Sequence, residues 1–334
     1  MKISELAIKN VRALPDLSRR LAGPSKRPFD VVLITGPMGS GKTRLLSAIA
    51  AWKEAAGPYG SPPRLADWER REGQGGSLSG VWELTEDEAR RGQLAAASVP
   101  VRVDVGPKAG APEVPAGLRR VLSAFFREET HGKVEYFPAS RRLSRAPLPV
   151  PLDALSEKVE AAMRLGDDED RYAIERAWLH ARLSADLAAG ASTLSSRGVL
   201  LSGQAPDSLG GVRAAIARLA PHLRLLGLSS NGPKATVRFV RSDRTEVDLD
   251  DLSFGEKQAV LFAAAFHRLA LSRSVVLIDT PEMGIHPADH ARFFQAITDL
   301  GRDNQIIAAT CSPGILSTVP PEQIIDLGAA EPRA

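Results

Sequence analysis

Cysteine is almost missing from the sequence: Cys311 is the only one in 334 residues. A single cysteine rules out an intramolecular disulfide framework and a CxxC metal site. Net charge is also nearly absent, with a formal value of +3 at pH 7. A balance this weak does not indicate binding of nucleic acid or membranes through overall charge. We expect a protein of a reducing compartment, the cytoplasm.

Long apolar stretches are missing as well. The longest run, around residues 259–266, is far below the roughly 20 residues that a membrane span needs. Lys2, Glu5 and Lys9 interrupt the first residues, so we expect no secretory signal there. The composition is 43% hydrophobic and 25% charged, which is typical of a soluble globular protein without a membrane segment.

Strand and helix patterns are clearest at the two ends of the chain. Residues 2–8 alternate polar and apolar side chains, which predicts an edge strand, and the apolar run 29–35 predicts a buried strand. Strand and helix patterns alternate in residues 233–334, which indicates a parallel sheet. We therefore predict an α/β head built from residues 1–55 and 233–334. The segment 56–232 between them is predicted to be an insertion with a mobile loop, short strands and a helical subdomain.

A glycine-rich turn follows the run 29–35 and precedes a helical pattern. It reads GPMGSGKT and matches the phosphate-loop pattern GxxxxGK[ST], with the residues Gly36, Pro37, Met38, Gly39, Ser40, Gly41, Lys42 and Thr43. Glycines let the backbone wrap around phosphate oxygens, and the loop N–H groups and the helix N-terminus then face the anion. Lys42 is expected to reach the β- and γ-phosphates, and Thr43 to ligate Mg²⁺. The alternative is a turn that only links strand and helix.

A second part of a nucleotide site is predicted at residues 275–279, which read VVLID. Asp279 ends this apolar run as a Walker B acid does, at the edge of the sheet where it holds Mg²⁺ beside the phosphate loop. Many buried strands end in an acid, so the pattern counts only together with the phosphate loop. The two motifs together predict ATP and Mg²⁺ as ligands.

Three further segments resemble those of ABC-type ATPases. LSFGEKQ at 252–258 resembles their signature motif. VVLIDTPEMGIHP at 275–287 resembles a segment of compact AAA/ABC-like heads, which include OLD-like, SMC-like and prokaryotic defence ATPases. IKNVR at 8–12 is similar to the first element of those heads, and by this resemblance Arg12 belongs to the nucleotide site. The resemblance implies a P-loop NTPase head of the ABC type with a mixed sheet.

The resemblance also implies how the site is completed. In such heads the signature of one subunit grips the γ-phosphate of ATP bound to the other, so that ATP drives a head-to-tail homodimer. Ser253, the Gly255 N–H and the helix N-terminus form an anion pocket of this kind. The alternative is that Ser253 only caps an amphipathic helix, with Glu256 closing a capping box.

Two positions depart from the family pattern and lower the hydrolysis that we expect. Thr280 stands where the family has a catalytic glutamate, and Cys311 stands where it has a switch histidine. Threonine is a poor base, and a neutral thiol is a weak hydrogen-bond donor. Loss of a general base typically lowers a rate by about 10²–10⁴. Glu282 is the candidate substitute base; the alternative is that it caps or pairs in the turn.

Aromatic and basic residues elsewhere carry less weight. No stacking platform for nucleic acid is predicted, because we expect no clustering of the tryptophans with basic residues: Trp52, Trp68, Trp82 and Trp178. For three arginines we favour a solvated basic turn over a position near the phosphates: Arg141, Arg142 and Arg145.

We predict an ATPase that acts as an ATP-driven dimerisation switch, hydrolyses ATP slowly and controls a protein effector. The effector follows from the resemblance to ATPases of defence and genome-maintenance systems, which is an analogy at the level of the fold. The alternatives are a conventional DNA-associated ATPase of the SMC or OLD type and the ATPase subunit of a membrane transporter. The long insertion and the lack of an assignable Q-loop glutamine count against a transporter. DNA binding by the closed dimer stays open, although charge does not indicate it.

Overall fold

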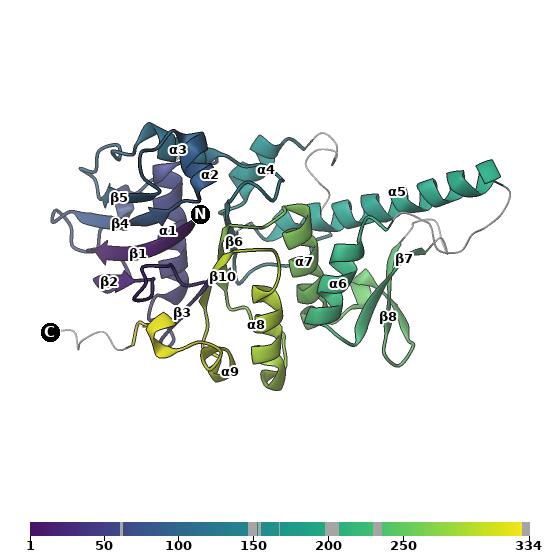
Figure 1. Cartoon of the computed structure of the whole chain (residues 1–334). Coiled ribbons are helices and arrows are strands. Elements are labelled where there is room, and N and C mark those ends of the chain that lie inside the picture. The colour runs from purple at the N-terminus through teal and green to yellow at the C-terminus, as the bar shows by residue number, and fades with distance from the viewer. Residues whose placement is uncertain are drawn as a thin grey trace.

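The computed structural model describes residues 1–60, 63–145, 152, 155–166, 168–197, 207–229 and 236–328. Its described strands form one parallel and two antiparallel sheets, and helices lie between and beside them (Figure 1). The fold is therefore α/β, as predicted, with the parallel and antiparallel strands in separate sheets.

The five-stranded parallel sheet positions the predicted motifs. Its strand order is β12-β3-β11-β10-β6, and its members are β3 (Val31–Thr35), β6 (Val134–Phe137), β10 (Val275–Asp279), β11 (Gln305–Ala309) and β12 (Ile324–Asp326). Every residue of β10 and β11 is buried, as expected for parallel strands covered on both faces. Because parallel strands end at the same edge, the segments after β3, β10 and β11 lie side by side.

Alternate residues of this sheet face two different cores. On β3, Val32 and Ile34 pack into one core, and Leu33 packs into the other. This follows from the two-residue period of a strand, whose successive side chains point to opposite faces. Both faces are covered, which explains the unbroken apolar runs.

The first core lies between the parallel sheet and a four-stranded antiparallel sheet of order β2-β1-β4-β5. The sheet consists of β1 (Lys2–Lys9), β2 (Leu17–Arg20), β4 (Gly76–Glu83) and β5 (Ser98–Val105). The helices on this side are α1 (Lys42–Ala56), α2 (Glu86–Gly92) and α3 (Ala116–Ser123). The predicted edge strand is wrong, because β1 pairs with both β2 and β4. β2 has no buried residue, so no hydrophobic pattern marks it in the sequence.

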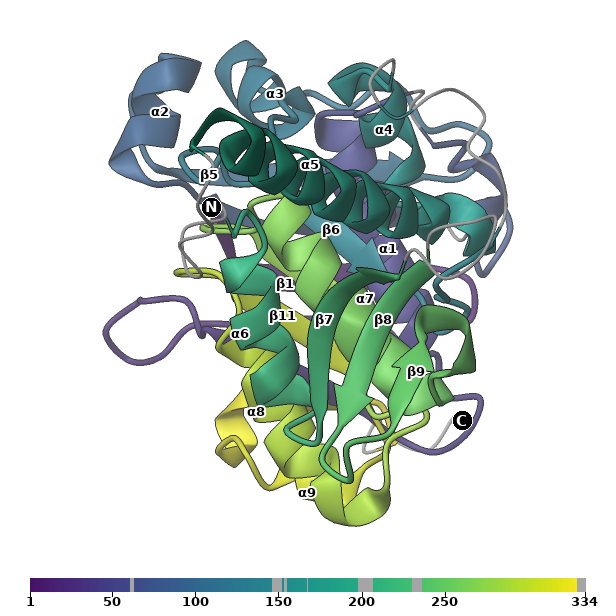
Figure 2. The same ribbon diagram turned by 90° about the vertical axis from the view of Figure 1, so that its right-hand side faces the viewer.

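The second core lies on the other face of the parallel sheet, where helices and a small antiparallel sheet pack (Figure 2). The helices are α4 (Glu157–Met163), α5 (Ala173–Arg197), α6 (Gly210–Leu219), α7 (Phe254–Arg268), α8 (His290–Thr298) and α9 (Pro313–Leu316). The sheet is β7 (Leu223–Ser229), β8 (Thr236–Arg241) and β9 (Glu246–Asp248). Short 3₁₀ helices are η1 (Ala66–Trp68), η3 (Glu169–Tyr172), η4 (Leu249–Asp251), η5 (Pro287–Asp289) and η6 (Pro321–Gln323). In Figure 1, α5 extends well beyond the helices beside it.

The segment 56–232 contributes to both large sheets. β4 pairs with β1, and β6 pairs with β10, so the part of the segment up to β6 supplies strands to both sheets. α4, α5 and α6 follow β6, and they make up the helical portion predicted for this segment. The described part of the segment that stands outside the head sheets therefore begins after β6.

Buried ion pairs fasten the helical portion to the head. Arg164, just after α4, lies 2.7 Å from Glu135 on β6 and 3.3 Å from Glu175 on α5. Arg268 on α7 lies 2.7 Å from the same Glu175. These side chains are almost completely buried. Removing one member of such a network leaves an uncompensated buried charge, so the network favours a single docking position of α4 and α5.

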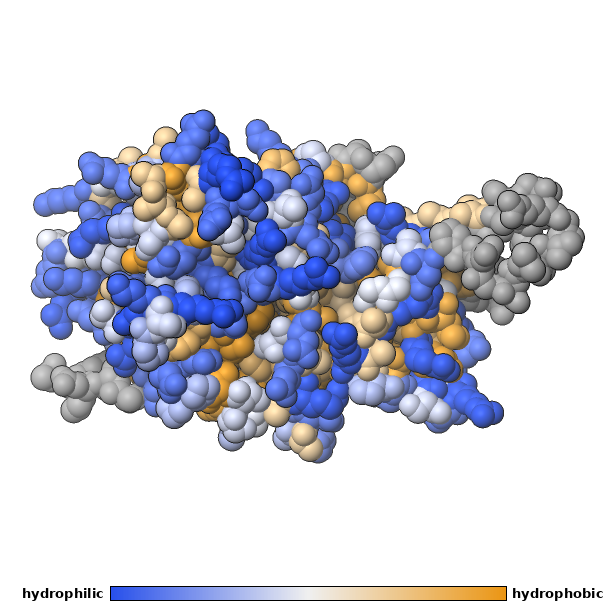
Figure 3. All heavy atoms as spheres, viewed as in Figure 1, coloured by the Kyte–Doolittle hydropathy of each residue, from blue (hydrophilic) through white to orange (hydrophobic). Residues whose placement is uncertain are grey.

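The face of the molecule shown in Figure 3 is mainly hydrophilic, and apolar side chains reach it in scattered areas. Among the described helices, none combines the length and the apolar character that crossing a bilayer requires.

Candidate nucleotide site

The phosphate loop has a backbone that only glycine accepts at two positions. Gly36 has a φ of 142° and Gly41 a φ of 100°, conformations that L side chains rarely adopt. A Cβ on Gly41 would lie 2.6 Å from the carbonyl oxygen of Ala13, and one on Gly36 would lie 2.7 Å from Ser40 Oγ. The loop is thus packed tightly against the segment after β1 and against itself.

Helix α1 begins without any internal capping. Gly41 is its N-cap and makes no side-chain hydrogen bond, and no acidic residue lies in the first turn. The first N–H groups of a helix need partners, and the positive end of the helix dipole favours an anion. Ser40 Oγ beside it is buried and has no hydrogen-bond partner among the described residues. Open N–H groups and an unpartnered hydroxyl fit a bound phosphate.

Lys42 folds back over the loop. Its Nζ donates to the carbonyl oxygens of Gly36 and Pro37, both at 2.9 Å. These neutral acceptors hold the ammonium over the glycine turn, where phosphate oxygens can replace them with stronger, charge-assisted hydrogen bonds.

Thr43 and Asp279 meet at the carboxyl edge of the parallel sheet. The Thr43 hydroxyl donates a 2.7 Å hydrogen bond to Asp279 Oδ2, and Asp279 is 3% exposed. A hydroxyl and a carboxylate supply the oxygen ligands that Mg²⁺ prefers, with the rest coming from phosphate and water. The residues present therefore fit ATP with Mg²⁺. When bound, Mg²⁺ would be held by Thr43 and Asp279 and would neutralise charge on the phosphates.

Thr280, the residue in place of the family's glutamate, is not positioned as a base. Its hydroxyl donates to Asp279 Oδ1 at 3.2 Å. Its φ is 49°, an unusual conformation for a β-branched residue. The N–H of Thr280 bonds Ala309 O at 2.9 Å, which fixes the end of β10 against β11.

Glu282 and Cys311 lie next to each other beside the phosphate loop. Glu282 Oε1 accepts from the Thr310 hydroxyl at 2.8 Å and from the Cys311 N–H at 3.3 Å. The Cys311 Sγ lies 3.7 Å from the Gly36 carbonyl oxygen. Glu282 Oε2 is buried and has no partner among the described residues. The carboxylate thus pairs in the turn through Oε1, as one alternative predicted, and its Oε2 accepts no hydrogen bond from the described residues.

The predicted signature begins with a capping box. Ser253 Oγ accepts from the Glu256 N–H at 3.2 Å, and Glu256 Oε2 accepts from the Ser253 N–H at 2.7 Å. Arg241 binds Glu256 through two hydrogen bonds of 2.9 Å, and with the other hydrogen bonds it lowers the pKa of Glu256 to about 2. This cap uses the N–H of Glu256. The N–H groups of Phe254 and Gly255 bond to none of the described residues.

The signature packs on the turn that follows the Walker B segment. Gly255 leaves no room for a side chain, because a Cβ there would lie 2.5 Å from Gly284 O. Gly284 has a φ of 78°, and a Cβ on it would overlap the ring of Phe254. The start of α7 and the turn after β10 therefore hold each other in place.

Arg12 and Trp68 gather beside the first turn of α1. The Arg12 N–H donates to Trp68 O at 2.7 Å, and the guanidinium of Arg44 lies 3.9 Å from the centre of the Trp68 ring. Burial, and then the nearby charge of Arg12, lower the pKa of Arg44. The prediction that no tryptophan clusters with basic residues is wrong for Trp68, and also for Trp178, whose ring centre lies 6.0 Å from the guanidinium of Arg182.

Arg141 is buried, contrary to the predicted solvated turn. It is 0% exposed and binds the backbone at the end of β10, and burial lowers its pKa to about 10. Arg142 lies 3.6 Å from Asp170, and Arg145 binds Asp250 at 2.8 Å on the surface. Composition cannot distinguish the three arginines, since only the fold decides which one points inward.

Sequence reasoning also missed Gln258 and His290. Gln258, on α7, is buried and accepts a hydrogen bond from Arg141. His290 on α8 joins two segments of the site: Nδ1 lies 2.8 Å from Ser312 Oγ, and Nε2 lies 3.0 Å from Ile285 O. Gln258 stands inside the quoted motif and could have been singled out, whereas nothing in the spacing marks His290.

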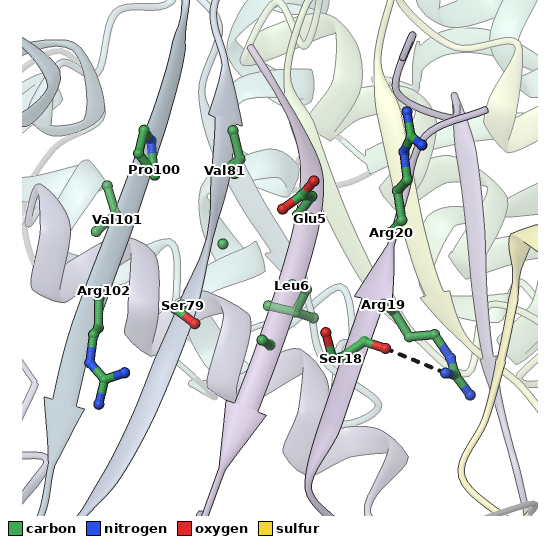
Figure 4. Close-up of a pocket in the computed structure, with 12 residues that line it drawn as sticks. Glu5, Leu6, Ser18, Arg19, Arg20, Ser79, Val81, Pro100, Val101 and Arg102 are labelled. Atoms are coloured by element: carbon green, nitrogen blue, oxygen red, sulfur yellow. Dashed lines mark hydrogen bonds between the residues drawn. The ribbon is translucent and has the colours of Figure 1, made fainter. Parts of the chain in front are cut away.

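A hollow of about 510 Å³ lies on the outer face of the antiparallel sheet (Figure 4). Ser79 and Leu6 are among its lining residues, with arginines on both sides. Arg102 is paired with Asp104 at 2.9 Å. None of the predicted site residues lines this hollow, so it is separate from the candidate nucleotide site.

A family model described as "AAA domain, putative AbiEii toxin, Type IV TA system" matches residues 121–317, more than half of the chain. The match includes the predicted signature, residues 252–258, and the Walker B segment, residues 275–279. It does not include the phosphate loop, which the structure brings to Asp279. No curated protein gives a significant match to the chain.

Solved structures of Smc heads have the same fold. One, titled as an Smc head bound to the C-winged helix domain of ScpA, superposes with a TM-score of 0.55 at 14% identity. The superposition covers 98% of this chain and 94% of that one. A second, an Smc head with an extended coiled coil bound to the C-terminal domain of ScpA from Pyrococcus furiosus, gives 0.53 at 13% identity, covering 97% and 93%. The family match and this shared fold together confirm the predicted resemblance to P-loop ATPase heads, ABC-like or SMC-like.

Proposed function

We propose that this chain, which belongs to the family described as "AAA domain, putative AbiEii toxin, Type IV TA system", is an ATP-driven dimerisation switch with slow hydrolysis. Its fold is that of a P-loop ATPase head. The observation that carries the proposal is the meeting of Thr43 with Asp279 beside an uncapped helix start. That arrangement supplies separate partners for phosphate and for Mg²⁺.

Slow hydrolysis follows from the residues around the expected γ-phosphate. The hydroxyl of Thr280 is already bonded to Asp279, and Cys311 offers a thiol where the related heads have an imidazole. Glu282 is the carboxylate that can accept a proton from water, because its Oε2 has no partner among the described residues. Its other oxygen is held by Thr310 and Cys311. We therefore assign Glu282 as the base of a slow reaction.

Exposed apolar side chains in the phosphate loop and in the predicted signature support a homodimer. Met38, at the tip of the phosphate loop, is 99% exposed, and Phe254, at the start of the signature helix, is 44% exposed. Large apolar side chains in solvent favour burial at an interface. A head-to-tail dimer would bring the phosphate loop of one protomer to Ser253 of its partner and cover both side chains.

The proposal includes control of a protein partner. The Smc heads named above were solved with ScpA domains bound, and the family description names a toxin system. In this chain, the helical portion extends from the head along α5 (Figure 1). We propose that this portion carries the surface for the effector. Affinity purification with ATP and with ADP tests it. The wild type should retain the effector differently with the two nucleotides, and Lys42→Ala should lose that difference. Equal retention by the wild type under both conditions would contradict ATP control.

The central test measures size and chemistry together. Sedimentation of the wild type with and without ATP–Mg²⁺ should show a dimer only with the nucleotide, and phosphate release should be slow but above background. A protein that stays monomeric with bound ATP would contradict the switch, and nucleotide binding without any phosphate release would contradict the ATPase.

A mixing experiment decides whether Ser253 acts on the partner's nucleotide. Ser253→Asp keeps a good N-cap but adds a negative charge that repels phosphate. Thr85→Asp is the matched control, since Thr85 caps α2 with the same type of capping box. Ser253→Asp and Lys42→Ala should each lose dimerisation, whereas their mixture should regain it, because one of its two sites is intact. A mixture as inactive as its parts would contradict a shared site.

A further inference from the structure

Arg141 is a buried cation that carries no charge partner within hydrogen-bond distance among the described residues. It is 0% exposed. Nη1 donates to Asp279 O at 2.5 Å and to Pro138 O at 3.0 Å, and Nη2 donates to Thr280 O at 2.8 Å. A guanidinium can hold several carbonyl groups at once, because its donors lie in one rigid plane. Arg141 thus fixes the last carbonyl group of the Walker B segment, on Asp279, and the next one, on Thr280.

The Nε donor of Arg141 reaches the signature helix. Nε donates to Gln258 Oε1 at 2.7 Å, and Gln258 Nε2 donates back to the carbonyl oxygen of Arg141 at 3.3 Å. Gln258 is 1% exposed and lies on the second turn of α7, whose N-cap is Ser253. A shift or rotation at the start of α7 would therefore move Gln258 and, with it, the Arg141 guanidinium that holds the end of β10.

The held end of β10 is under conformational constraint. Thr280 has a φ of 49°, which a β-branched residue adopts only when its surroundings impose it. The surroundings here are the bond from its N–H to Ala309 O and the bond from Arg141 to its carbonyl oxygen. Loss of the second bond would let the backbone relax and change the position of the Asp279 carboxylate.

We propose that Arg141 is a positioning residue that couples the signature helix to the Mg²⁺ ligand Asp279 through Gln258. The inference rests on the proposed function, because Ser253 is taken to contact the nucleotide of the partner protomer. ATP bound by one protomer then sets the geometry of the partner's own Walker B end. The two nucleotides of the dimer bind cooperatively as a result, since each completes the other's metal site.

The test uses the full-length protein and the fluorescent nucleotide MANT-ATP. Arg141→Lys keeps the charge but cannot span the carbonyl groups and Gln258; Gln258→Leu cuts only the link to α7. With Arg141→Lys, the factor by which Mg²⁺ tightens MANT-ATP binding should fall at least about tenfold, while affinity without Mg²⁺ stays unchanged. With Gln258→Leu, the Hill coefficient for ATP should fall to one and kcat should fall about tenfold, with KM unchanged.

The controls separate positioning from general damage to the fold. Arg145→Lys is the matched variant, because Arg145 pairs with Asp250 on the surface and should leave every value unchanged. The double variant Arg141→Lys/Gln258→Leu should be no worse than Arg141→Lys alone, since both changes break one connection. A general loss of folding would instead weaken binding with and without Mg²⁺ equally.

Three results would overturn the inference: wild-type kcat and Hill coefficient in Gln258→Leu, an unchanged Mg²⁺ factor in Arg141→Lys, or additive losses in the double variant. Failure of the proposed function looks different. A wild type that binds MANT-ATP and releases no phosphate would contradict the proposed ATPase activity. The factor by which Mg²⁺ tightens MANT-ATP binding would still test the role of Arg141.

Discussion

The Thr43 hydroxyl donates a 2.7 Å hydrogen bond to Asp279, and the two residues stand 236 positions apart in the chain. Thr43 is the second residue of helix α1, which follows β3, and Asp279 ends β10. β11 lies between these strands in the sheet, and all three run parallel. The site is therefore a product of strand order, which brings residues from both ends of the chain to one edge.

Lys42→Ala is expected to weaken ATP binding at least about 100-fold, because each charge-assisted hydrogen bond to phosphate contributes about 1.5–3 kcal/mol. Titration with MANT-ATP measures the change. Lys108→Ala is the control, since Lys108 is exposed and lies outside the site. Equal affinities of the Lys42→Ala variant and the wild type would show that the loop does not bind phosphate.

Glu282→Gln is expected to lower kcat for phosphate release by about 10²–10⁴ with ATP affinity unchanged, because an amide cannot accept the proton of water. The amide can still accept from Thr310 and Cys311, so the turn is preserved. Glu322→Gln, on an exposed carboxylate, serves as the control. A wild-type rate in Glu282→Gln would leave Glu282 as a residue of the turn only.

The fold class and the phosphate and Walker B motifs were predictable from the sequence, because local patterns carry them. The phosphate loop needs glycines at fixed spacing, and VVLID needs burial on both faces of one strand. The signature was predicted in the same way, and Ser253 has the capping box that was weighed as its alternative. Its action on a partner's nucleotide is still a prediction.

What the sequence could not show depends on contacts between distant segments. Arg141 and Arg142 are neighbours of the same type, yet one is buried against β10 and the other lies 3.6 Å from Asp170. Trp68 meets Arg44 only because the segment before β4 folds over α1. The exposed strand β2 has no buried residue and so gave no hydrophobic signal.

Gly284→Ala is expected to destabilise the protein more than Gly73→Ala does. Both glycines have nearly the same φ, 78° and 77°, so the conformational cost of alanine is shared. A Cβ at Gly73 meets nothing within 4 Å, whereas one at Gly284 overlaps the Phe254 ring. Overpacking of this kind costs about 1–3 kcal/mol. Urea unfolding measures the difference, and equal losses would contradict the packing of the signature on this turn.

Lys53 is expected to make stability rise with pH above neutrality. Burial lowers its pKa to about 7, with Glu54 acting in the opposite direction. The unfolded chain keeps the ordinary pKa of 10.5. Between about pH 7 and 10 the unfolded state therefore binds more protons than the folded state, so the free energy of unfolding increases by up to about 1.4 kcal/mol per pH unit. The cost of the buried charge is complete below pH 7 and fades above it.

Lys53→Met removes this titration, so its free energy of unfolding should rise less steeply between pH 7 and 9.5 than that of the wild type. Lys133, whose pKa burial lowers to about 8, contributes a slope of the same sign in both proteins, so only the difference between them reports on Lys53. Lys108→Met, at an exposed lysine, should keep the wild-type slope. Urea unfolding at several pH values measures all three. Identical slopes in Lys53→Met and wild type would mean that Lys53 stays fully protonated in the folded protein.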